Sequence, residues 1–335
     1  MVRSVSISGV LTLDLHSLSN EGTEGNRQLT RQVQVALEDG SFHTVNAISG
    51  DMLKHAQCEY FREVADEANL PLCHPARRSD ANRINADESF RDWLVEKTGK
   101  KARELEQKWS ISSKGNGKFA RPASEVLGEI MKRCALTDVE GTLLVQYGYS
   151  VPRKSCVEFG WVVGRPGHTR TDSYVHVKYD PEFRGASAGE ESGLGQALFY
   201  RPASSGQYAA VVHLELDRVG RNDVTFEYAV AEDDRRQRIK ALLQSVTYTF
   251  VRPRGAHRNT QLPHVLGFQG IIATSSGAPP APSASALVDS YRERVEATTK
   301  ELNTLGRNEV VKSKRFDTMD AFVSEMHRIT ASLGA

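Results

Sequence analysis

The sequence predicts an α+β fold whose core elements follow the order strand, helix, strand, strand, helix, strand. Three observations predict it. The N-terminus shows a strand pattern, two long amphipathic helices begin near residues 49 and 234, and apolar strand-like runs lie before and after the second helix. This βαββαβ order is the ferredoxin-like split pattern that RNA-recognition-motif domains share. It defines a fold class and leaves function to be argued from the site.

The first strand is predicted from a run in which apolar and polar residues alternate. Val5, Ile7, Leu11, Leu13 and Leu15 occupy odd positions, and mainly small polar residues fill the even ones. Such alternation is typical of a strand with one buried face and one face in water. The stretch LHSLSNEGTEGNRQL, residues 15–29, then leaves the strand as a loop rich in Gly and Asn. Its glycines would allow close backbone approach to a ligand, although an ordinary surface turn has a similar composition.

The next elements are a hairpin over 32–47 that turns at Asp39-Gly40, and a helix from an N-cap at Ser49 to about Asn69. Residues 75–140 are rich in charged residues and have a helical pattern. Two helical segments, ESFRDWLVEKTGKKARELEQKW and ASEVLGEIMKRC, are separated by the loop SSKGNGK. This stretch is predicted to be an insertion. A strand at 142–150 is predicted to return the chain to the sheet.

The second half begins with a polar tract over 164–206, which is predicted to be a protruding arm with strands near Tyr174–Tyr179 and Leu198–Tyr200. A disordered surface loop is the alternative. A strand at 209–216, a helix at 234–250 and a strand at 266–273 complete the core. After a Pro- and Ser-rich connection, helices from Leu287 to Gly306 and over 318–333 should pack their apolar stripes on the chain's own core or, as a second possibility, on a neighbouring subunit.

Composition sets limits on the class of protein. The chain has 335 residues, 39% of them hydrophobic, and a formal net charge of +1. It has neither a membrane-length apolar run nor a signal-peptide pattern, so we expect a cytoplasmic protein without membrane partners. The four cysteines, Cys58, Cys73, Cys134 and Cys156, form no CxxC pair, so neither a disulfide framework nor a zinc site is indicated. We expect no cofactor and no bound metal.

Charge is concentrated between Arg235 and Gln261, where seven Lys or Arg residues occur without an acid. The first half reads as a solvated helix face in which Asp234 can pair with Arg238. The second half is a loop with donors suited to phosphates and no acid nearby in sequence. We therefore predict an anion-binding loop composed of Arg254, Arg258, Asn259, Thr260 and Gln261.

Several blocks, taken together and in order, carry a resemblance to a known family: SISGVLTLDLHSLSNEGTEGN, VNAISGDMLKHAQ, TRTDSYVHVKYD, FYRPASSGQYA and GAHRNTQLPHV. They resemble the DevR-type backbone subunit of type I CRISPR Cascade complexes, the Cas-seven family. The resemblance runs from residue 3 to about 292. The helical stretch at 75–140 and the C-terminal tail show no family motif.

The resemblance implies a hand-shaped protein. Residues 1–68, 141–163 and 207–275 would form an RNA-recognition-motif palm, residues 69–140 a helical finger insertion and residues 164–206 a β-hairpin thumb. Residues 276–335 would be a helical segment packed on the palm. Members of the family polymerise head to tail along one CRISPR RNA, work with other Cascade subunits and support recognition of target DNA. Each thumb displaces one nucleotide of the guide.

The resemblance also implies which residues bind the guide. The loop NEGTEGN would lie against the RNA backbone, and the start of the first helix would hold phosphates. From its residues, the arm could touch nucleic acid or a neighbouring subunit through its Thr-Arg-Thr turn and the aromatic residues at its base. By these implications, the RNA-binding residues are Asn20, Gly22, Thr23, Gly25, Asn26, Ser49, Lys54, His55, Thr169, Arg170 and Thr171, and the wedge of the thumb is Phe199 and Tyr200.

Two alternatives remain open. Asp14, Glu21 and Glu24 could in principle hold Mg²⁺, as in the metal-dependent endoribonucleases among the related type III backbone subunits. No His or Lys accompanies them at catalytic spacing, so we predict a protein that is not an enzyme. A DNA-binding regulator is the third interpretation, but the sequence lacks a helix-turn-helix signal.

Overall fold

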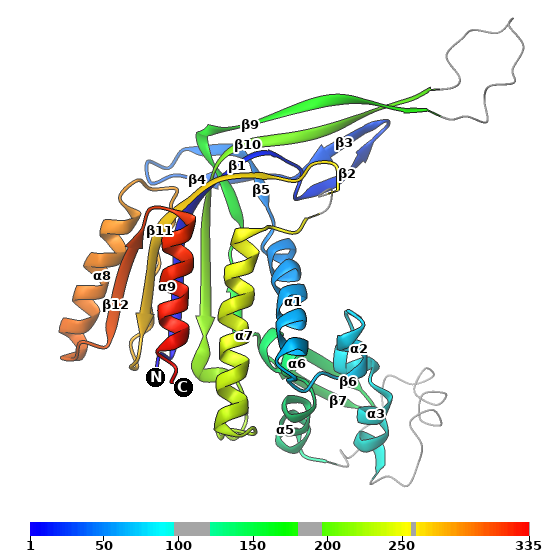
Figure 1. Cartoon of the computed structure of the whole chain (residues 1–335), viewed down its shortest axis with the longest axis vertical. Helices are drawn as coiled ribbons and strands as arrows, with labels where there is room; N and C mark the ends of the chain where they lie inside the picture. The colour runs from blue at the N-terminus through cyan, green and yellow to red at the C-terminus, as the bar shows by residue number, and fades with distance from the viewer. Residues whose placement is uncertain (97–120, 180–195, 256–258, 335) are drawn as a thin grey trace, which may run out of the picture.

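The computed structural model describes residues 1–96, 121–179, 196–255 and 259–334. They form a mixed α+β fold around one large sheet with the strand order β12-β11-β1-β10-β9-β5-β4 (Figure 1). The two neighbours of β1 both run antiparallel to it. The strands of this path are β1 (Ser4–His16), β4 (Gln32–Ala36), β5 (Phe42–Ile48), β9 (Val162–Tyr179), β10 (Gln196–Glu215), β11 (His264–Ser275) and β12 (Val311–Phe316).

Three helices cover one face of the sheet: α1 (Gly50–Glu67), α7 (Glu232–Val251) and α9 (Met319–Ala331) (Figure 1). Ser49 caps α1 as predicted, because its hydroxyl accepts a hydrogen bond from the Met52 N–H at 3.2 Å. Four phenylalanines, with neighbouring ring centroids 4.6–5.7 Å apart, join α7, β11, β12 and α9; they are Phe250, Phe268, Phe316 and Phe322. Val5, Ile7, Leu11 and Leu13 of β1 belong to the same core, whereas Leu15, which was expected on the same buried face, is 43% exposed.

The predicted α+β class is confirmed, but one predicted core strand is not in the main sheet. A shorter strand that was not predicted, β8 (Val157–Phe159), pairs with β10. The stretch 142–150 was expected in the main sheet, and this expectation is wrong. It forms a separate two-stranded sheet with the residues that follow, β6 (Thr142–Gln146) and β7 (Tyr149–Arg153). The turn between them uses the left-handed backbone conformation at Tyr147 and Gly148.

The expectation that one face of β1 lies in water is also wrong. Ser4, Ser6 and Ser8 are buried because the segment 279–287 lies across them. The N–H of Ala281 donates to Ser4 Oγ at 3.1 Å, and Ser6 Oγ donates to the Ala281 carbonyl at 2.8 Å. The N–H of Ala284 donates to Ser8 Oγ at 3.2 Å. These serines therefore form hydrogen bonds with the backbone of residues 279–287 instead of with water. We call residues 279–287 the strap.

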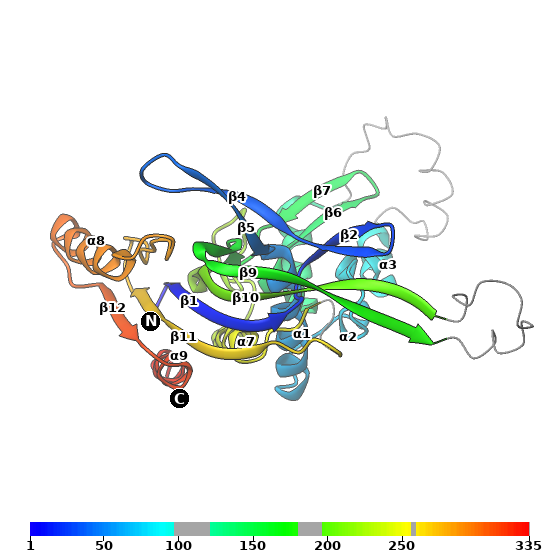
Figure 2. The same cartoon turned by 90° about the horizontal axis from the view of Figure 1, so that it is seen from above.

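Beyond the strap, α8 (Tyr291–Gly306) completes the cover of this second face, on the opposite side of the sheet from α9 (Figure 2). Tyr291 and Val295 pack with Val10 and Ile271 in a second core. The β4–β5 hairpin, which turns at Asp39-Gly40 as predicted, reaches the same side, where Arg294 pairs with Glu38. Both faces of the sheet are thus covered.

The tail differs from the prediction in two respects. Its first helix begins at Tyr291 instead of Leu287, and Leu305 is 83% exposed instead of packed. The tail is also not wholly helical, because β12 pairs with β11 at the edge of the sheet. The second predicted helix is confirmed as α9, with Phe322, Met326 and Ile329 buried on the core.

The stretch 75–140 is helical where the structure describes it; the predicted loop SSKGNGK lies outside the described residues. Its elements are α2 (His74–Arg77), the short 3-10 helix η1 (Arg83–Ala86), α3 (Glu88–Val95), α5 (Ala123–Arg133) and α6 (Ala135–Glu140). The predicted arm is confirmed as a long ribbon of β9 and β10 that projects from the body (Figures 1 and 2). Its predicted tip, 180–195, is outside the described residues.

A buried ion network fastens the helical stretch to the body of the molecule. Asp138 of α6 has no exposed side-chain surface and pairs with Arg153 of β7 at 2.7 Å and with Arg238 of α7 at 2.9 Å. The Gly220 N–H donates to the same carboxylate at 3.0 Å. Arg238 also pairs with Asp234, as predicted, but its side chain is buried instead of lying on a solvated face.

We expect Asp138→Asn to reduce the free energy of unfolding by about 3 kcal/mol, because it leaves two buried guanidinium groups without their shared carboxylate. Asp233→Asn is the control, since the Asp233 side chain is 95% exposed and only 3.9 Å from Arg236. Urea denaturation of both variants at neutral pH measures the difference. Equal stabilities would show that the network contributes nothing.

Candidate nucleic-acid interface

The predicted loop NEGTEGN is a hairpin of two short strands, β2 (Asn20–Glu24) and β3 (Arg27–Thr30). Gly22 and Gly25 have φ values of 97° and 59°, and an added Cβ would meet no atom within 4 Å at either. The glycines are needed for the left-handed backbone instead of for close packing. Gly22, Thr23, Gly25 and Asn26 are exposed, while Asn20 is half-buried and accepts a hydrogen bond from Ser17.

We call the β2–β3 hairpin the palm hairpin and the ribbon of β9 and β10 the thumb ribbon. The two are hydrogen-bonded to each other and lie side by side in Figure 2. The Tyr200 N–H donates to the Asn26 carbonyl at 2.9 Å, and Asn26 Nδ2 donates to the Leu198 carbonyl at 3.2 Å. A polar groove of about 330 Å³ runs between hairpin and ribbon. It is lined by Glu21, Arg27, Gln28, Leu29, Thr30, Gln32, Thr171, Asp172, Ser173 and Pro202.

The predicted anion-binding loop reaches the base of the same ribbon. Gln261 Nε2 donates to the Pro202 carbonyl at 3.0 Å, and Arg201 donates to Thr260 Oγ1 at 3.2 Å. Asn259 and Thr260 are exposed, whereas Arg258 lies outside the described residues. Three segments that are far apart in sequence therefore meet at the base of the thumb.

Arg254 was expected to bind an anion, but the structure pairs its side chain with a carboxylate of the same chain. Its guanidinium forms a bidentate pair with Glu63 at 2.8 and 2.9 Å and stands 3.7 Å from the centroid of the Tyr60 ring. The hydrogen bonds that Arg254 donates to Glu63 raise the pKa of Arg254 above its usual value. The prediction that this loop has no acid nearby is wrong, because α1 supplies one in space. Arg254 fastens the loop to α1.

The three residues predicted to hold phosphates at the start of α1 differ in how accessible their side chains are. The Ser49 hydroxyl is buried and already used in capping, so it is not available to a phosphate. His55 is largely exposed, 3.6 Å from Glu59, and Lys54 is half-buried. Within the described residues, no hydrogen bond joins either side chain to the palm hairpin or to the thumb.

The thumb ribbon carries two different faces, since neighbouring residues of a strand point to opposite sides. On one face His176 stacks on Phe199, with centroids 5.6 Å apart and an interplanar angle of 17°, and the Arg201 guanidinium lies 4.9 Å from the Phe199 ring. Tyr200 belongs to the other face, opposite Val175. Phe199 and Tyr200 therefore cannot form one wedge as predicted.

The Thr-Arg-Thr segment of the thumb lies near its base. Arg170 is exposed and paired with Asp172 at 2.8 Å, and Thr171 Oγ1 is 2.8 Å from Ser204 Oγ. Thr169 is half-buried beside Gly206, where an added Cβ would meet the His168 carbonyl oxygen at 2.1 Å. Of this trio, Arg170 presents the most accessible group.

The acidic residues considered for a metal are dispersed. Asp14 accepts a hydrogen bond from Ser205 Oγ at 2.6 Å, and Glu21 and Glu24 are exposed on β2. In the part of the chain that the structure describes, no three His, Cys, Asp or Glu residues gather in a way that could hold a metal ion. None of the described helices is long and apolar enough to cross a membrane.

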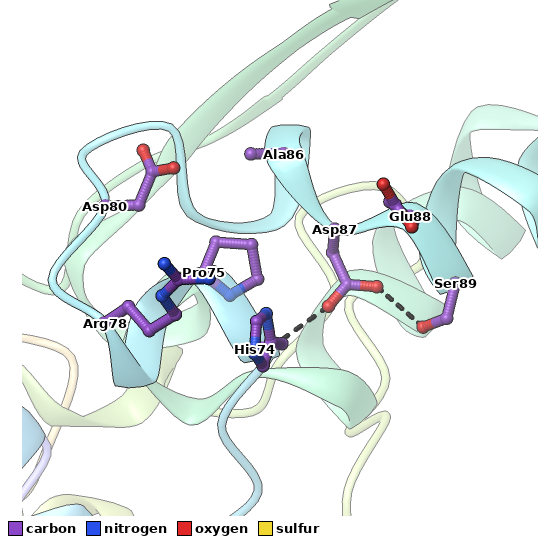
Figure 3. Close-up of a pocket in the computed structure, with 8 residues that line it drawn as sticks. All are labelled: His74, Pro75, Arg78, Asp80, Ala86, Asp87, Glu88 and Ser89. Atoms are coloured by element: carbon purple, nitrogen blue, oxygen red, sulfur yellow. Dashed lines mark hydrogen bonds between the residues drawn. The ribbon is translucent and has the colours of Figure 1, made fainter. Parts of the chain in front are cut away.

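A larger pocket of about 650 Å³ lies elsewhere, between α2 and the start of α3 (Figure 3). Asp87 accepts hydrogen bonds there from the His74 N–H, Ser89 Oγ and the Phe90 N–H. Arg78 and Asp80 line the same pocket with opposite charges. None of the predicted site residues lines it.

The comparisons with known proteins agree with this geometry. A family profile described as CRISPR-associated negative auto-regulator DevR/Csa2 matches residues 7–296. The chain belongs to this CRISPR-associated family, and the resemblance found in the sequence is confirmed.

Two known proteins are similar to this chain, one in sequence and one in fold. CRISPR-associated protein Cas7/Cst2/DevR of Methanocaldococcus jannaschii is 26% identical over 288 residues, which are 82% of this chain and 81% of that protein. A chain of a solved structure described as a CRISPR RNA-guided surveillance complex, pre-nicking, has a TM-score of 0.53 at 12% identity. That match covers 99% of this chain and 100% of the other, and it shows a shared fold.

A buried histidine begins a chain of side-chain contacts that ends at the palm hairpin. The sequence analysis did not identify this histidine. His16 packs edge-on against Tyr208 with ring centroids 5.0 Å apart, and Tyr208 donates to Asn46 at 2.9 Å. Asn46 in turn donates to Thr30 Oγ1 at the end of β3. Burial lowers the pKa of His16 to about 4, against a smaller opposing effect from Asp14.

This burial predicts a dependence of stability on pH. His16 binds a proton near pH 6.5 in the unfolded chain but only near pH 4 in the folded one, so stability falls as the pH falls between these values. From pH 7.5 to pH 5 we expect a loss of about 2 kcal/mol from this group. Urea denaturation should show a weaker pH dependence in His16→Phe. The same slope in both proteins would contradict the assignment.

Proposed function

We propose that this protein is a backbone subunit of a Cascade-type complex, which binds CRISPR RNA and repeats head to tail along it. In this role it supports recognition of target DNA together with other Cascade subunits, in the cytoplasm. Family membership supports the assignment, and the described geometry supports the location of the RNA. The palm would be the RNA-recognition-motif-like body formed by β1, α1, β8, β10, α7 and β11.

One observation carries the proposal. The palm hairpin, the base of the thumb and residues 259–261 form one connected exposed edge, joined by the hydrogen bonds of Asn26, Arg201 and Gln261. The strap and α8 cover part of the broad sheet face, which supports placing the RNA along this edge. Stacked aromatic rings with a nearby guanidinium, as at Phe199, are suited to single-stranded bases.

The decisive experiment is to sequence the RNA that copurifies with the protein from its own cells. A population of repeat and spacer sequences is the expected result. A population that reflects general cellular RNA would contradict a dedicated guide holder.

Phe199→Ala should weaken binding of a guide-length RNA about tenfold, because base–aromatic stacking contributes about 1–3 kcal/mol per base. Tyr200→Ala is the matched control, since it removes a ring from the opposite face of the same strand. Fluorescence anisotropy at one fixed salt concentration measures both. Equal losses in the two variants would show that the stacking face has been wrongly assigned.

The protein is proposed to bind RNA without cutting it. Incubated with labelled target RNA and Mg²⁺ or Mn²⁺, the assembled protein should leave the strand intact, since Asp14 accepts a hydrogen bond from Ser205 and no three His, Cys, Asp or Glu residues in the described part of the chain gather in a way that could hold a metal ion. Cuts that disappear in Asp14→Ala or Glu24→Ala would establish the endoribonuclease alternative.

A further inference from the structure

Three side chains next to the strap form a continuous row of hydrogen bonds, which we call the polar row. It begins at Ser6 of β1, passes through His213 of β10 and ends at Glu215 of the same strand. Ser6 Oγ lies 2.7 Å from His213 Nδ1, and His213 Nε2 lies 2.7 Å from Glu215 Oε1. Distances this short are typical of hydrogen bonds in which a charged group takes part.

The Ser6 hydroxyl has only one hydrogen, and the strap accepts it. Ser6 Oγ is 2.8 Å from the carbonyl oxygen of Ala281, which can accept a hydrogen bond but cannot donate one. Ser6 therefore donates to the strap and can offer only lone pairs to His213. The hydrogen between Ser6 and His213 must consequently belong to Nδ1 of the ring.

The other ring nitrogen is restricted in the same way. The hydrogen bond that His213 donates lowers the pKa of the Glu215 carboxyl, so Glu215 is ionised near neutral pH and can only accept. Nε2 therefore carries a hydrogen as well. A ring with a hydrogen on both nitrogens is an imidazolium cation, so the three hydrogen bonds of the row and the strap form together only when His213 is positively charged.

The charged groups around the ring come from two strands and the turn after them. Glu215 lies on the same strand, and Glu158 of β8 is the antiparallel neighbour of the histidine. Arg218 and Asp217, in the turn after β10, act on Glu215 with opposite signs. The strap has no ionisable side chain between its two ends. The ring is thus the group of the row that can change its charge near neutral pH.

The polar row has the residue types of a hydrolase triad, but its geometry suits holding the strap. Ser6 is 1% exposed, so a substrate has no access to its hydroxyl. The hydrogen of that hydroxyl is directed at Ala281, and the histidine is a donor to the serine instead of its base.

Loss of one proton from the ring breaks the contact with the strap. The remaining hydrogen stays on Nε2, because an Nε2 lone pair would face the carboxylate of Glu215 at 2.7 Å. Nδ1 then becomes an acceptor and competes with the Ala281 carbonyl for the single hydrogen of Ser6. The acceptor that loses is left with its lone pairs directed at a buried oxygen, which is unfavourable.

We propose that His213 is a proton-dependent switch that closes the strap: the doubly protonated ring lets Ser6 hold Ala281, and loss of one proton releases this contact. The ring can exchange protons with water, because its side chain is 23% exposed. The strap can separate without breaking a helix or a strand, since residues 279–287 belong to neither. Its release uncovers the serine face of β1. This inference is independent of the proposed function.

Hydrogen exchange on the full chain measures the strap directly. The N–H groups of Ala281 and Ala284 donate to Ser4 Oγ and Ser8 Oγ in the closed strap, so their exchange reports its opening. As the pH rises from about 5 to about 8, where histidines change charge, their protection factors should fall about tenfold or more after correction for the intrinsic exchange rate. Constant protection factors over this range would overturn the proposal.

Glu215→Gln distinguishes a proton-dependent switch from a merely structural contact. An amide can donate as well as accept, so the new side chain can donate to an unprotonated Nε2 and allow a neutral ring to keep its hydrogen on Nδ1. The strap should then stay closed over the whole pH range. A pH dependence equal to that of wild type would contradict the proposal.

Two further variants complete the test. Ser6→Ala removes the contact itself, so the strap should be loose to the same extent at every pH. His43→Ala is the matched control, because His43 also contacts a serine, Ser41 Oγ at 3.0 Å, but on the exposed β4–β5 hairpin. It should keep the wild-type behaviour. A pH dependence that persists in Ser6→Ala, or one that disappears in His43→Ala, would assign the effect to another group.

Nuclear magnetic resonance of protein labelled with ¹⁵N in its histidines gives a readout that does not depend on any change in stability. The ring signals that disappear in His213→Gln are those of His213. In wild type, these signals should show hydrogen on both nitrogens while the strap is closed, and the ring should lose a proton over the same pH interval in which the strap loosens. A neutral His213 ring under a closed strap would show that the switch is wrongly assigned.

Discussion

The carboxylate of Asp138 is the interaction on which the arrangement of this molecule depends. It is fully buried and unites a helix of the 75–140 stretch, a strand of the small sheet and a helix of the body through Arg153, Arg238 and the Gly220 N–H. Buried charges are tolerated only when each is paired and hydrogen-bonded, so these elements have little freedom to shift relative to one another. Arg153 also donates to the Arg218 and Arg221 carbonyls, which extends the network to the start of the loop at 222–229.

The second constraint is the closure of the sheet. Proteins that bind RNA on an open sheet need exposed aromatic residues on its strands. Here the corresponding face of β1 presents serines that bind the strap, and α8 and the β4–β5 hairpin complete the cover. In the proposed function the RNA therefore follows the edge of the sheet, where the palm hairpin and the thumb ribbon lie. The ribbon has Phe199 and His176 on one face, and Tyr200, Val175, Val177 and Leu198 on the other, because neighbouring residues of a strand point to opposite sides.

Much of this could be predicted from periodicity and turn residues. The alternation in β1, the cap at Ser49, the turn at Asp39-Gly40, the helix α7 and the thumb strands all follow from local pattern, and the resemblance supplied the family. What failed depended on distant chain segments. No local signal shows that Glu63 pairs with Arg254, that the strap covers Ser6, or that residues 142–150 leave the main sheet. The pairing of Phe199 and Tyr200 as one wedge is different, since strand alternation alone argues against it. The burial of His16 had only its place in an apolar run as a signal.

The position of β1 has a consequence for how the chain reaches this structure. β1 is made first, yet its partners in β10 and β11 follow much later in the chain, as in the pairs Ser4↔Glu215 and Ser4↔Ser275, and its serine face is closed only by the strap. Contacts of such long sequence separation slow folding, because the loop between them must close before the contact forms. During synthesis the first strand therefore has both edges unpaired until most of the protein has left the ribosome. Apart from Val10, its even positions are all polar, and this polar face would keep the unpaired strand from pairing with the wrong neighbour.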